Sequence, residues 1–446
     1  MAHTLVLVGI AIMKNQETRG NDMDDTVSAA RWRRRSLLGA LVTAPVAAGG
    51  VLAACGNSPG TAHAAGTAPA TPETSGRDQI PPDTLPGGGY DRYVAKLAAQ
   101  GKFSGVVLLS HRGRTVLSRS YGMADQEKGI RNHEGVAFSL SSAGKPFGAV
   151  AILQLVQAGK VQLTDTVGTH LTGFAKEIAD QVTIHHMLCG TSGLNSPEED
   201  PHRVFTSREE AHEYYEQLAR QAKRVAAPGT GDDGHAGADI TIPALIVEAV
   251  TGTTYWDYVQ EHIFGRAGMT GTGFYTRPQW LTDEHIAHPY MLLADGGQVD
   301  AVRNLDKSTP NPEEPGKNPG RGFIDAPGDG GFATAPDLVR FAHALRDGTL
   351  LGRPYADVLT GAKVPHAQAR NGQAPPTRVS FGAYHMPVSI TNGQWVFGRA
   401  GAGPGLAASW NIYPDTDWVG VLLSNYDDLP LQEITQQEVQ AVTGQH

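Results

Sequence analysis

Cysteine is scarce in this sequence, which has two in 446 residues, Cys55 and Cys189. Cys55 lies in a predicted lipidation motif, and once it carries a lipid no intramolecular disulfide can form. Clustered cysteines that would hold a zinc ion are also absent from the sequence. The fold must therefore be stabilised by an apolar core, and with 40% hydrophobic residues the chain can build a large one.

Charged residues are also few. They make up 18% of the chain, the formal net charge is −9, and no run of Lys or Arg occurs after residue 35. Nucleic-acid binding requires a basic face, so the sequence argues against a nucleic-acid partner.

Cofactor motifs are missing as well. The 17 histidines form no His-Glu-x-x-His motif, so the sequence predicts no metal site. The Gly-rich stretch "GAGPG" at 401–405 has neither the lysine of a phosphate loop nor the spacing of a dinucleotide site. We therefore expect no cofactor.

The N-terminal segment is typical of an export signal. "RWRRRSLLGALVTAPVAAGGVLAAC", residues 31–55, has a basic start, an apolar stretch and small residues before Cys55. Arg34 and Arg35 resemble a twin-arginine signal, and residues 52–55 resemble a bacterial lipobox. We expect residues 1–55 to direct export and to anchor the protein by lipid on the outer face of the cytoplasmic membrane.

Two questions about this segment stay open. An ordinary signal peptide with a chance cysteine would give a secreted protein without an anchor. The sequence also leaves open whether translation starts at Met1, Met13 or Met23.

The remainder divides into a linker and one folded domain. Residues 56–86 consist mainly of Gly, Ala, Pro, Ser and Thr and predict a flexible tether. Residues 87–446 begin with two β-rich runs on either side of His111–Arg114 and end with a strand hairpin around "YPDTDW" and a helix over Leu431–Val442. Because helical patterns lie between these strands, we predict an α+β fold, an antiparallel sheet flanked by helices with an inserted, mostly helical subdomain.

The predicted helices between the strands follow from apolar periodicity. The run Phe147–Ala158 is apolar on all sides, as in a buried helix, and Gly159 ends it. The further helical patterns cover 208–224, 241–250, 255–264 and 336–346.

Ser142 and Lys145 are the first candidates for catalysis. Ser142 lies at the start of the Phe147 helix, and a lysine three residues later places its amine beside the hydroxyl. A buried lysine can lose its proton and act as a base for the serine. A single Ser-x-x-Lys occurs by chance too often to decide the function.

Five segments, taken in order, resemble the β-lactamase-related serine hydrolases. They are "FSGVVLLSHRGRTVLSRSYGMAD", "FSLSSAGKPFGAVAILQLVQAGKVQLTDTV", "VTIHHMLCGTSGL", "DGGFATAPDLVRFAHAL" and "IYPDTDWVGVLLSN". The family includes class C β-lactamases, D-Ala-D-Ala carboxypeptidases and β-lactamase-fold esterases. The resemblance implies that Ser142 is the acylated nucleophile and Lys145 its helper base.

The family's second motif, Tyr-x-Asn, is altered here. Counting back from the helix end "VEAVTG" places His235-Ala236-Gly237 in its position, so His235 would replace the tyrosine and Gly237 the asparagine. A histidine can accept a serine proton near neutral pH. The alternative is that "GDDGHAGAD" is a loop with an incidental histidine.

The third motif, Lys/His-x-Gly, aligns with Arg399-Ala400-Gly401. Arginine cannot shuttle a proton, but its forked donors suit a substrate carboxylate. An anionic group on the substrate is therefore a hypothesis, with Gly237, Arg399 and Gly401 as substrate-binding positions. By the same resemblance, the backbone amides of Ser142 and Ala402 form the oxyanion hole.

Two functions from different classes remain. The first is an exported serine hydrolase acting on an ester or amide through an acyl-enzyme, and an acyltransferase would differ only in its acceptor. The second is a catalytically impaired lipoprotein that binds cell-wall material or peptides. The substrate would be a small molecule or a peptidoglycan-like compound. Without a Gly-x-Ser-x-Gly elbow an α/β-hydrolase is disfavoured, and we expect Ser192 and Cys189 to be structural.

Overall fold

The computed structural model describes residues 79–230, 237–365 and 378–444. The predicted export signal, Cys55 and residues 56–78 of the predicted linker lie outside these ranges, and so does His235. The predicted boundaries at 55, 56 and 86 therefore stay predictions.

An eight-stranded antiparallel sheet forms the centre of the described structure, in the order β2-β1-β14-β13-β12-β11-β10-β9. Its strands are β1 Gly105–His111, β2 Arg114–Tyr121, β9 Val364–Pro365, β10 Arg378–Gly382, β11 Pro387–Thr391, β12 Gln394–Gly403, β13 Leu406–Tyr413 and β14 Trp418–Ser424. Three two-stranded ladders accompany it: β3 Met123–Asp125 with β4 Ile130–Arg131, β5 Phe138–Ser139 with β8 Phe332–Ala333, and β6 Tyr290–Leu292 with β7 Gln298–Asp300.

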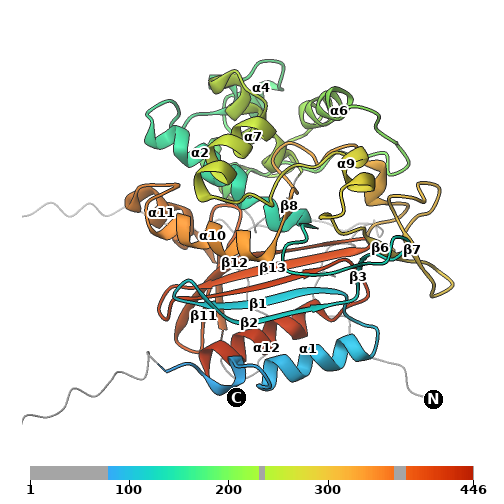
Figure 1. Cartoon of the computed structure of the whole chain (residues 1–446). Coiled ribbons are helices and arrows are strands. Elements are labelled where there is room, and N and C mark those ends of the chain that lie inside the picture. Colours follow the sequence, from blue (N-terminus) through green and yellow to red (C-terminus); the bar gives the residue numbers. More distant parts are fainter. Residues whose placement is uncertain (1–78, 231–236, 366–377, 445–446) are drawn as a thin grey trace, which may run out of the picture. The chain divides into compact units, whose positions relative to one another are not determined.

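The first and the last described parts of the domain meet in this sheet, where β1 and β14 lie side by side near the β2 edge. β1 pairs with β14 from Gly105 opposite Ser424 to His111 opposite Trp418. All seven residues of β1 are buried, since helices cover the sheet on both faces (Figure 1). A strand covered on both faces needs a continuous apolar run instead of alternation, and "GVVLLSH" is largely of that kind.

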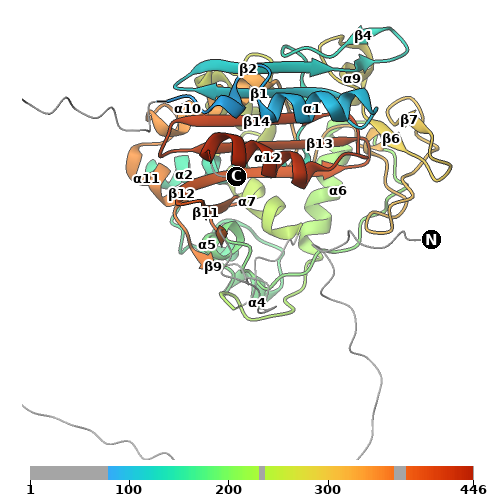
Figure 2. The ribbon, with the colours of Figure 1, turned by 90° about the horizontal axis from the view of Figure 1, so that it is seen from below.

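One face is covered by the first and the last helix. α1 Gly89–Ala99 and α12 Leu431–Thr443 lie side by side across the strands (Figures 1 and 2). Their apolar residues join those of the sheet in a separate core that includes Tyr90, Trp418 and Ile434.

The opposite face carries the larger core and most of the remaining helices (Figure 1). These helices are α2 Pro146–Gln157, α3 Val167–His170, α4 Lys176–Ala179, α5 Ile184–Leu188, α6 Arg208–Arg220, α7 Ala238–Thr251, α8 Tyr255–Val259, η4 Gln260–Gly265, α9 Arg277–Thr282, α10 Ala335–Arg346 and α11 Arg353–Thr360, with the short 3-10 turns η3 Ser141–Gly144 and η5 Pro319–Arg321. The 3-10 turn η2 Pro82–Thr84 instead contacts α1 and α12. Phe147 of α2 is fully buried, and its ring meets the rings of Phe264 and Phe341 edge to face at centroid distances of 4.9 and 5.0 Å.

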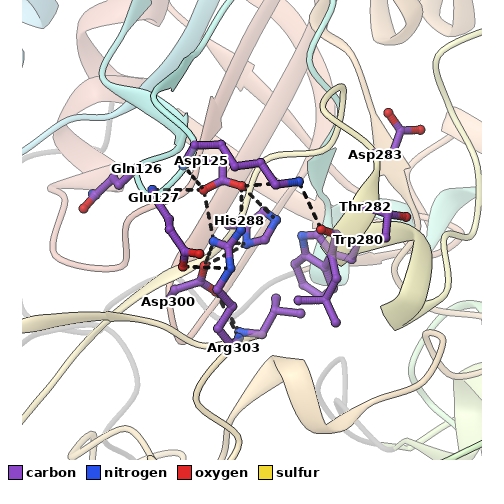
Figure 3. Close-up of polar contacts among 12 residues, drawn as sticks. Asp125, Gln126, Glu127, Trp280, Thr282, Asp283, His288, Asp300 and Arg303 are labelled. Atoms are coloured by element: carbon purple, nitrogen blue, oxygen red, sulfur yellow. Dashed lines mark hydrogen bonds and ion pairs between the residues drawn. The ribbon is translucent and has the colours of Figure 1, made fainter.

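A buried polar network ties the β3–β4 hairpin to the β6–β7 hairpin (Figure 3). Arg303 donates to Asp125 at 2.7 Å and to Asp300 at 2.5 Å, and His288 contacts Asp300 at 2.8 Å. Although burial opposes it, hydrogen bonding from Arg303 lowers the pKa of Asp125 to about 2. The guanidinium of Arg303 is therefore paired with two carboxylates, which offsets the cost of removing these charges from water.

The structure confirms the predicted α+β fold with its helical insertion. The two hairpins, the buried helix and the closing helix form where expected, and Gly159 follows α2 with a φ of 67°. Three of the predicted helices differ in extent: the pattern over 208–224 ends at Arg220, the pattern over 241–250 begins earlier, at Ala238, and the pattern over 255–264 divides into α8 and the π-helical turn η4. Within the described ranges, the helices lack the length and apolar content needed to cross a bilayer.

The aromatic cluster around Phe147 makes a stability prediction. Phe147→Ala should lower the free energy of unfolding by about 3–5 kcal/mol, because the removed ring leaves a cavity in a close-packed core. Urea denaturation followed by circular dichroism measures this change. Val225→Ala is the control, since Val225 is 70% exposed and surface changes usually stay within about 0.5 kcal/mol. Equal losses in the two variants would contradict the prediction.

Candidate active site

Ser142 lies in the 3-10 turn η3, directly before α2. In a 3-10 helix the side chains at i and i+3 eclipse each other, so Lys145 comes to lie over Ser142. Lys145 Nζ donates a short hydrogen bond to Ser142 Oγ. The predicted pairing of hydroxyl and amine is therefore present, although a 3-10 turn creates it and not the α-helix itself.

The residue before Ser142 has a strained backbone. Ser141 has a φ of 46°, in the left-handed region that residues with a side chain seldom adopt. Its hydroxyl donates to the Ala402 carbonyl of β12 at 3.1 Å. Strain of this kind persists where the surroundings determine the conformation, and it gathers at active sites.

Two glycines allow the backbone to close around this turn. A Cβ on Gly401 would lie 2.2 Å from the Leu140 carbonyl oxygen and 2.5 Å from the Ala143 nitrogen. A Cβ on Gly144 would lie 1.8 Å from the Gly330 carbonyl oxygen. The turn is therefore held between β12 and the loop that carries Gly330, at distances that exclude any side chain at Gly144 and Gly401.

Lys145 is almost fully buried, with 4% exposure. Burial lowers the pKa of its amine most strongly, the carboxylate of Asp329 opposes this, and the charge of Arg399 adds to the lowering. The net direction is downward, so a larger fraction of the amine is neutral near physiological pH than for a lysine in water. A neutral amine beside a hydroxyl is a general base for it.

Asp329 is a site residue that the sequence reasoning did not select. Its Oδ2 lies 3.2 Å from Lys145 Nζ, and its Oδ1 accepts a hydrogen bond from the Gly330 amide at 2.8 Å. Although burial opposes it, the positive charge of Lys145 lowers the pKa of this carboxyl. One feature of the sequence could have identified Asp329: it is the first residue of "DGGFATAPDL", the fourth of the five segments that resemble the family.

A cleft of about 530 Å³ opens at the serine. Its lining includes Ser142, Lys145, Asp329 and Ala402 together with Tyr215 from α6. The other charged residues of the lining are Glu198, Glu199, Glu314 and Lys317. These loop and helix residues had no recognisable pattern in the sequence, because they come from segments that only the fold brings together.

The second-motif residues are only partly described. His235 lies outside the described residues, so its role as a base stays a prediction. Gly237 precedes α7 and lines the cleft, with its amide donating to Ser196 Oγ at 2.9 Å. The structure thus brings Gly237 and Ala402 to the cleft of Ser142. The predicted oxyanion hole and the substrate contacts of Gly237 and Gly401 stay predictions.

Arg399 makes contacts that the sequence did not indicate. Its Nε donates to the Ser142 carbonyl at 3.2 Å and its Nη1 to the His385 carbonyl at 3.2 Å. Burial, followed by the charges of Arg399 and Lys145, lowers the pKa of His385 to about 4, so this ring is neutral at physiological pH. Arg399 thus holds the backbone at Ser142, and its binding of a substrate carboxylate stays a prediction.

Two other residues take the structural roles expected of them. Ser192 is buried, and its hydroxyl accepts from the Leu194 amide at 3.0 Å. Cys189 is buried, and burial raises the pKa of its thiol to about 12, so it is not a nucleophile. In the parts of the chain that the structure covers, no three His, Cys, Asp or Glu side chains gather where they could hold a metal ion.

The family model described as Beta-lactamase matches residues 90–443. The chain belongs to the β-lactamase family. Within it, the chain is 29% identical over 248 residues to the "Putative penicillin-binding protein PbpX" of Bacillus subtilis, covering 56% of each chain. It is 29% identical over 273 residues to "Esterase EstB" of Burkholderia gladioli, covering 54% of this chain and 65% of the esterase. The chain thus spans between about half and two thirds of the length of these curated relatives.

Solved structures of β-lactamase-family type share the fold. A penicillin-binding protein from Bacillus halodurans superposes with a TM-score of 0.63 at 23% identity, over 78% of this chain and 98% of that one. The octameric penicillin-binding protein homologue from Pyrococcus abyssi gives a TM-score of 0.66 at 19% identity, over 80% and 77%. At these identities the likeness establishes the fold alone.

The close approach at Gly401 makes a prediction for this β-lactamase-family site. Gly401→Ala forces β12 and the nucleophile turn apart. A displacement of about 1 Å in an active site can cost about 100-fold in rate, so covalent labelling of Ser142 by a fluorophosphonate should slow by about that factor. The second-order labelling rate measures it.

Gly403→Ala on the same strand is the matched control. Its Cβ would meet only the Leu406 side chain, at an ordinary 3.7 Å. We expect a much smaller change in the labelling rate. Equal slowing in both variants would show that β12 does not depend on Gly401 for its contact with the turn.

Proposed function

We propose that this protein is an exported serine hydrolase that cleaves an ester or amide through an acyl-enzyme on Ser142. The observation that carries the proposal is the hydrogen bond between Lys145 Nζ and Ser142 Oγ at the floor of an open cleft. Hydroxyl, base and space for a substrate occur together, which is the minimum that nucleophilic catalysis requires.

Acylation begins when the neutral amine of Lys145 takes the Ser142 proton. The Oγ–H bond breaks, a bond forms between Oγ and the carbonyl carbon, and the carbonyl electron pair moves to oxygen. Backbone amides of Ser142 and Ala402 stabilise that oxyanion, and such donors typically supply about 3 kcal/mol. The oxyanion then re-forms the carbonyl, the bond from the carbonyl carbon to the leaving group breaks, and the ammonium of Lys145 gives its proton to the leaving atom. The acyl group stays on Ser142.

A water molecule completes the cycle by attacking the acyl-enzyme. In our proposal His235 assists these proton transfers, as the tyrosine does in the family motif. A relative named as an esterase and another named as a penicillin-binding protein support an ester or amide substrate. A small ester and a peptidoglycan-like peptide, with or without a carboxylate for Arg399, are the candidates, and an acyltransferase would use the same intermediate.

We place this reaction outside the cytoplasm. The twin-arginine-like residues Arg34 and Arg35 and the lipobox-like residues 52–55 support export with lipid attachment at Cys55. The membrane would then be a partner through the lipid alone.

Ser142→Ala should abolish both fluorophosphonate labelling and p-nitrophenyl ester turnover, because no other group can form the acyl bond. Gel fluorescence and absorbance measure the two activities. Ser120→Ala, an exposed serine on β2, is the control and should react like the wild type. A Ser142→Ala protein that still labels would place the nucleophile elsewhere.

His235→Ala tests the predicted replacement of the tyrosine. Loss of general base assistance typically costs about 100-fold or more in rate, and we expect turnover of the p-nitrophenyl ester to fall by that order. Unchanged turnover would make His235 an incidental loop residue. A folded wild type that neither labels nor turns over, yet binds cell-wall fragments, would favour the binding lipoprotein instead.

A further inference from the structure

Lys145 lies between a hydroxyl and a carboxylate. Its Nζ donates to Ser142 Oγ on one side and lies 3.2 Å from Asp329 Oδ2 on the other. The sequence motif accounts for the serine but not for the acid, which comes from a loop 184 positions further along the chain (329 − 145 = 184).

The carboxylate of Asp329 is held in a defined orientation. Its Oδ1 accepts from the Gly330 amide at 2.8 Å, which leaves Oδ2 directed at the lysine. Gly330 has a φ of 66°, and a Cβ there would lie 2.4 Å from Asp325 Cγ. The loop geometry that aims Asp329 therefore depends on glycine at position 330.

We propose that Asp329 is the counter-ion of the ammonium that forms when Lys145 takes the Ser142 proton, and that it thereby sets the pH range in which this serine reacts. The proposal rests on the proposed function, because it assigns a role within the same acylation step. Asp329 acts through Lys145 and is a positioning residue.

The electron and proton balance of the step is complete without any further reactant. The Ser142 Oγ–H bond breaks, its proton binds the lone pair of Lys145 Nζ, and Oγ bonds to the acyl carbon. The new positive charge forms 3.2 Å from an existing negative charge, on a lysine that is almost fully buried and beside an aspartate that is partly buried. Asp329 stays ionised throughout, and the proton leaves from Lys145 to the departing group.

Among the described neighbours of Lys145, Asp329 acts against the lowering of the pKa of its amine. Burial lowers the pKa of the lysine, and so do the charges of Arg399 and Lys317, whereas Asp329 raises it. His385 also faces Lys145 but is neutral, since burial lowers its pKa to about 4. Removing the Asp329 charge should therefore move the lysine towards the neutral form at every pH.

Asp325 is the other titratable neighbour to consider. It accepts from the Gly331 amide at 2.7 Å, and burial, opposed by that hydrogen bond, raises its pKa to about 7. Tyr215 and Tyr255 also face Asp329, but burial raises the pKa of both phenols, so they stay neutral across the range of interest. A variant at Asp325 is needed to separate its titration from that of Lys145.

The test is the pH profile of fluorophosphonate labelling in Asp329→Asn, with Asp329→Glu as the conservative variant. An opposite charge at this distance shifts a pKa by about 1 to 3 units. The acidic limb of the profile is the low-pH side, where the labelling rate falls because Lys145 is protonated. In Asp329→Asn this limb should move to lower pH by about one unit or more. The plateau rate should fall, because the ammonium formed during acylation loses its counter-ion. Asp329→Glu should return the limb towards the wild-type position.

Two controls remove a nearby carboxylate that does not form the ion pair with Lys145. Glu314→Gln takes a charge from the same cleft, where its partner is Lys317 at 3.8 Å, and Asp325→Asn takes the neighbouring acid. Neither should move the acidic limb as Asp329→Asn does. A lower plateau with an unmoved limb in Asp329→Asn, or equal movement in a control, would overturn the proposal and leave Asp329 a structural residue.

A second readout separates this proposal from the proposed function. Competitive dinitrophenylation of Lys145, followed by peptide mass spectrometry across the pH series, titrates the amine whether or not Ser142 is acylated. A wild type that fails to label at Ser142 would refute the hydrolase, while the Lys145 titration would still test Asp329. The reactive fraction of Lys145 should rise at lower pH in Asp329→Asn, and an unmoved titration would overturn the inference.

Discussion

The contact between β12 and the turn that carries Ser142 is the constraint on which the site depends. Gly401 presses against backbone atoms of this turn, and Arg399 of the same strand donates to the Ser142 carbonyl. From the opposite side, Gly144 meets the loop at Gly330. A backbone held from two sides can keep the strained φ of Ser141, because close-packed surroundings determine a conformation that the isolated chain would avoid.

This constraint also explains why Lys145 is buried. The same packing that fixes the turn covers Lys145, and burial is the main reason that its pKa is lowered. The base strength of the lysine and the position of the serine are therefore two results of one arrangement. The carboxylate of Asp329 offsets the cost of burying the ammonium of Lys145, since a buried charge without a partner is strongly unfavourable.

The secondary-structure elements that the sequence predicted correctly are those marked by patterns of neighbouring residues. The hairpins, the buried helix after Lys145 and the closing helix follow from apolar runs and turn residues, and the resemblance of five segments led to the fold. The helix pattern over 255–264 was predicted as one helix but divides into α8 and the π-helical turn η4, a distinction of hydrogen-bond pattern that apolar periodicity cannot report.

For the site, the sequence by itself determined Ser142 and Lys145, because three-residue spacing in one turn is a local property. Gly401 follows from the sequence as the glycine of the third motif, whereas the contacts that exclude a side chain at Gly144 and Gly401 arise from the tertiary packing. Only the tertiary structure decided that Asp329 lies beside the lysine and that Arg399 holds backbone carbonyls. The physical reason is that charge partners far apart in the chain are chosen by how the sheet and loops pack, and no spacing in the sequence records that choice.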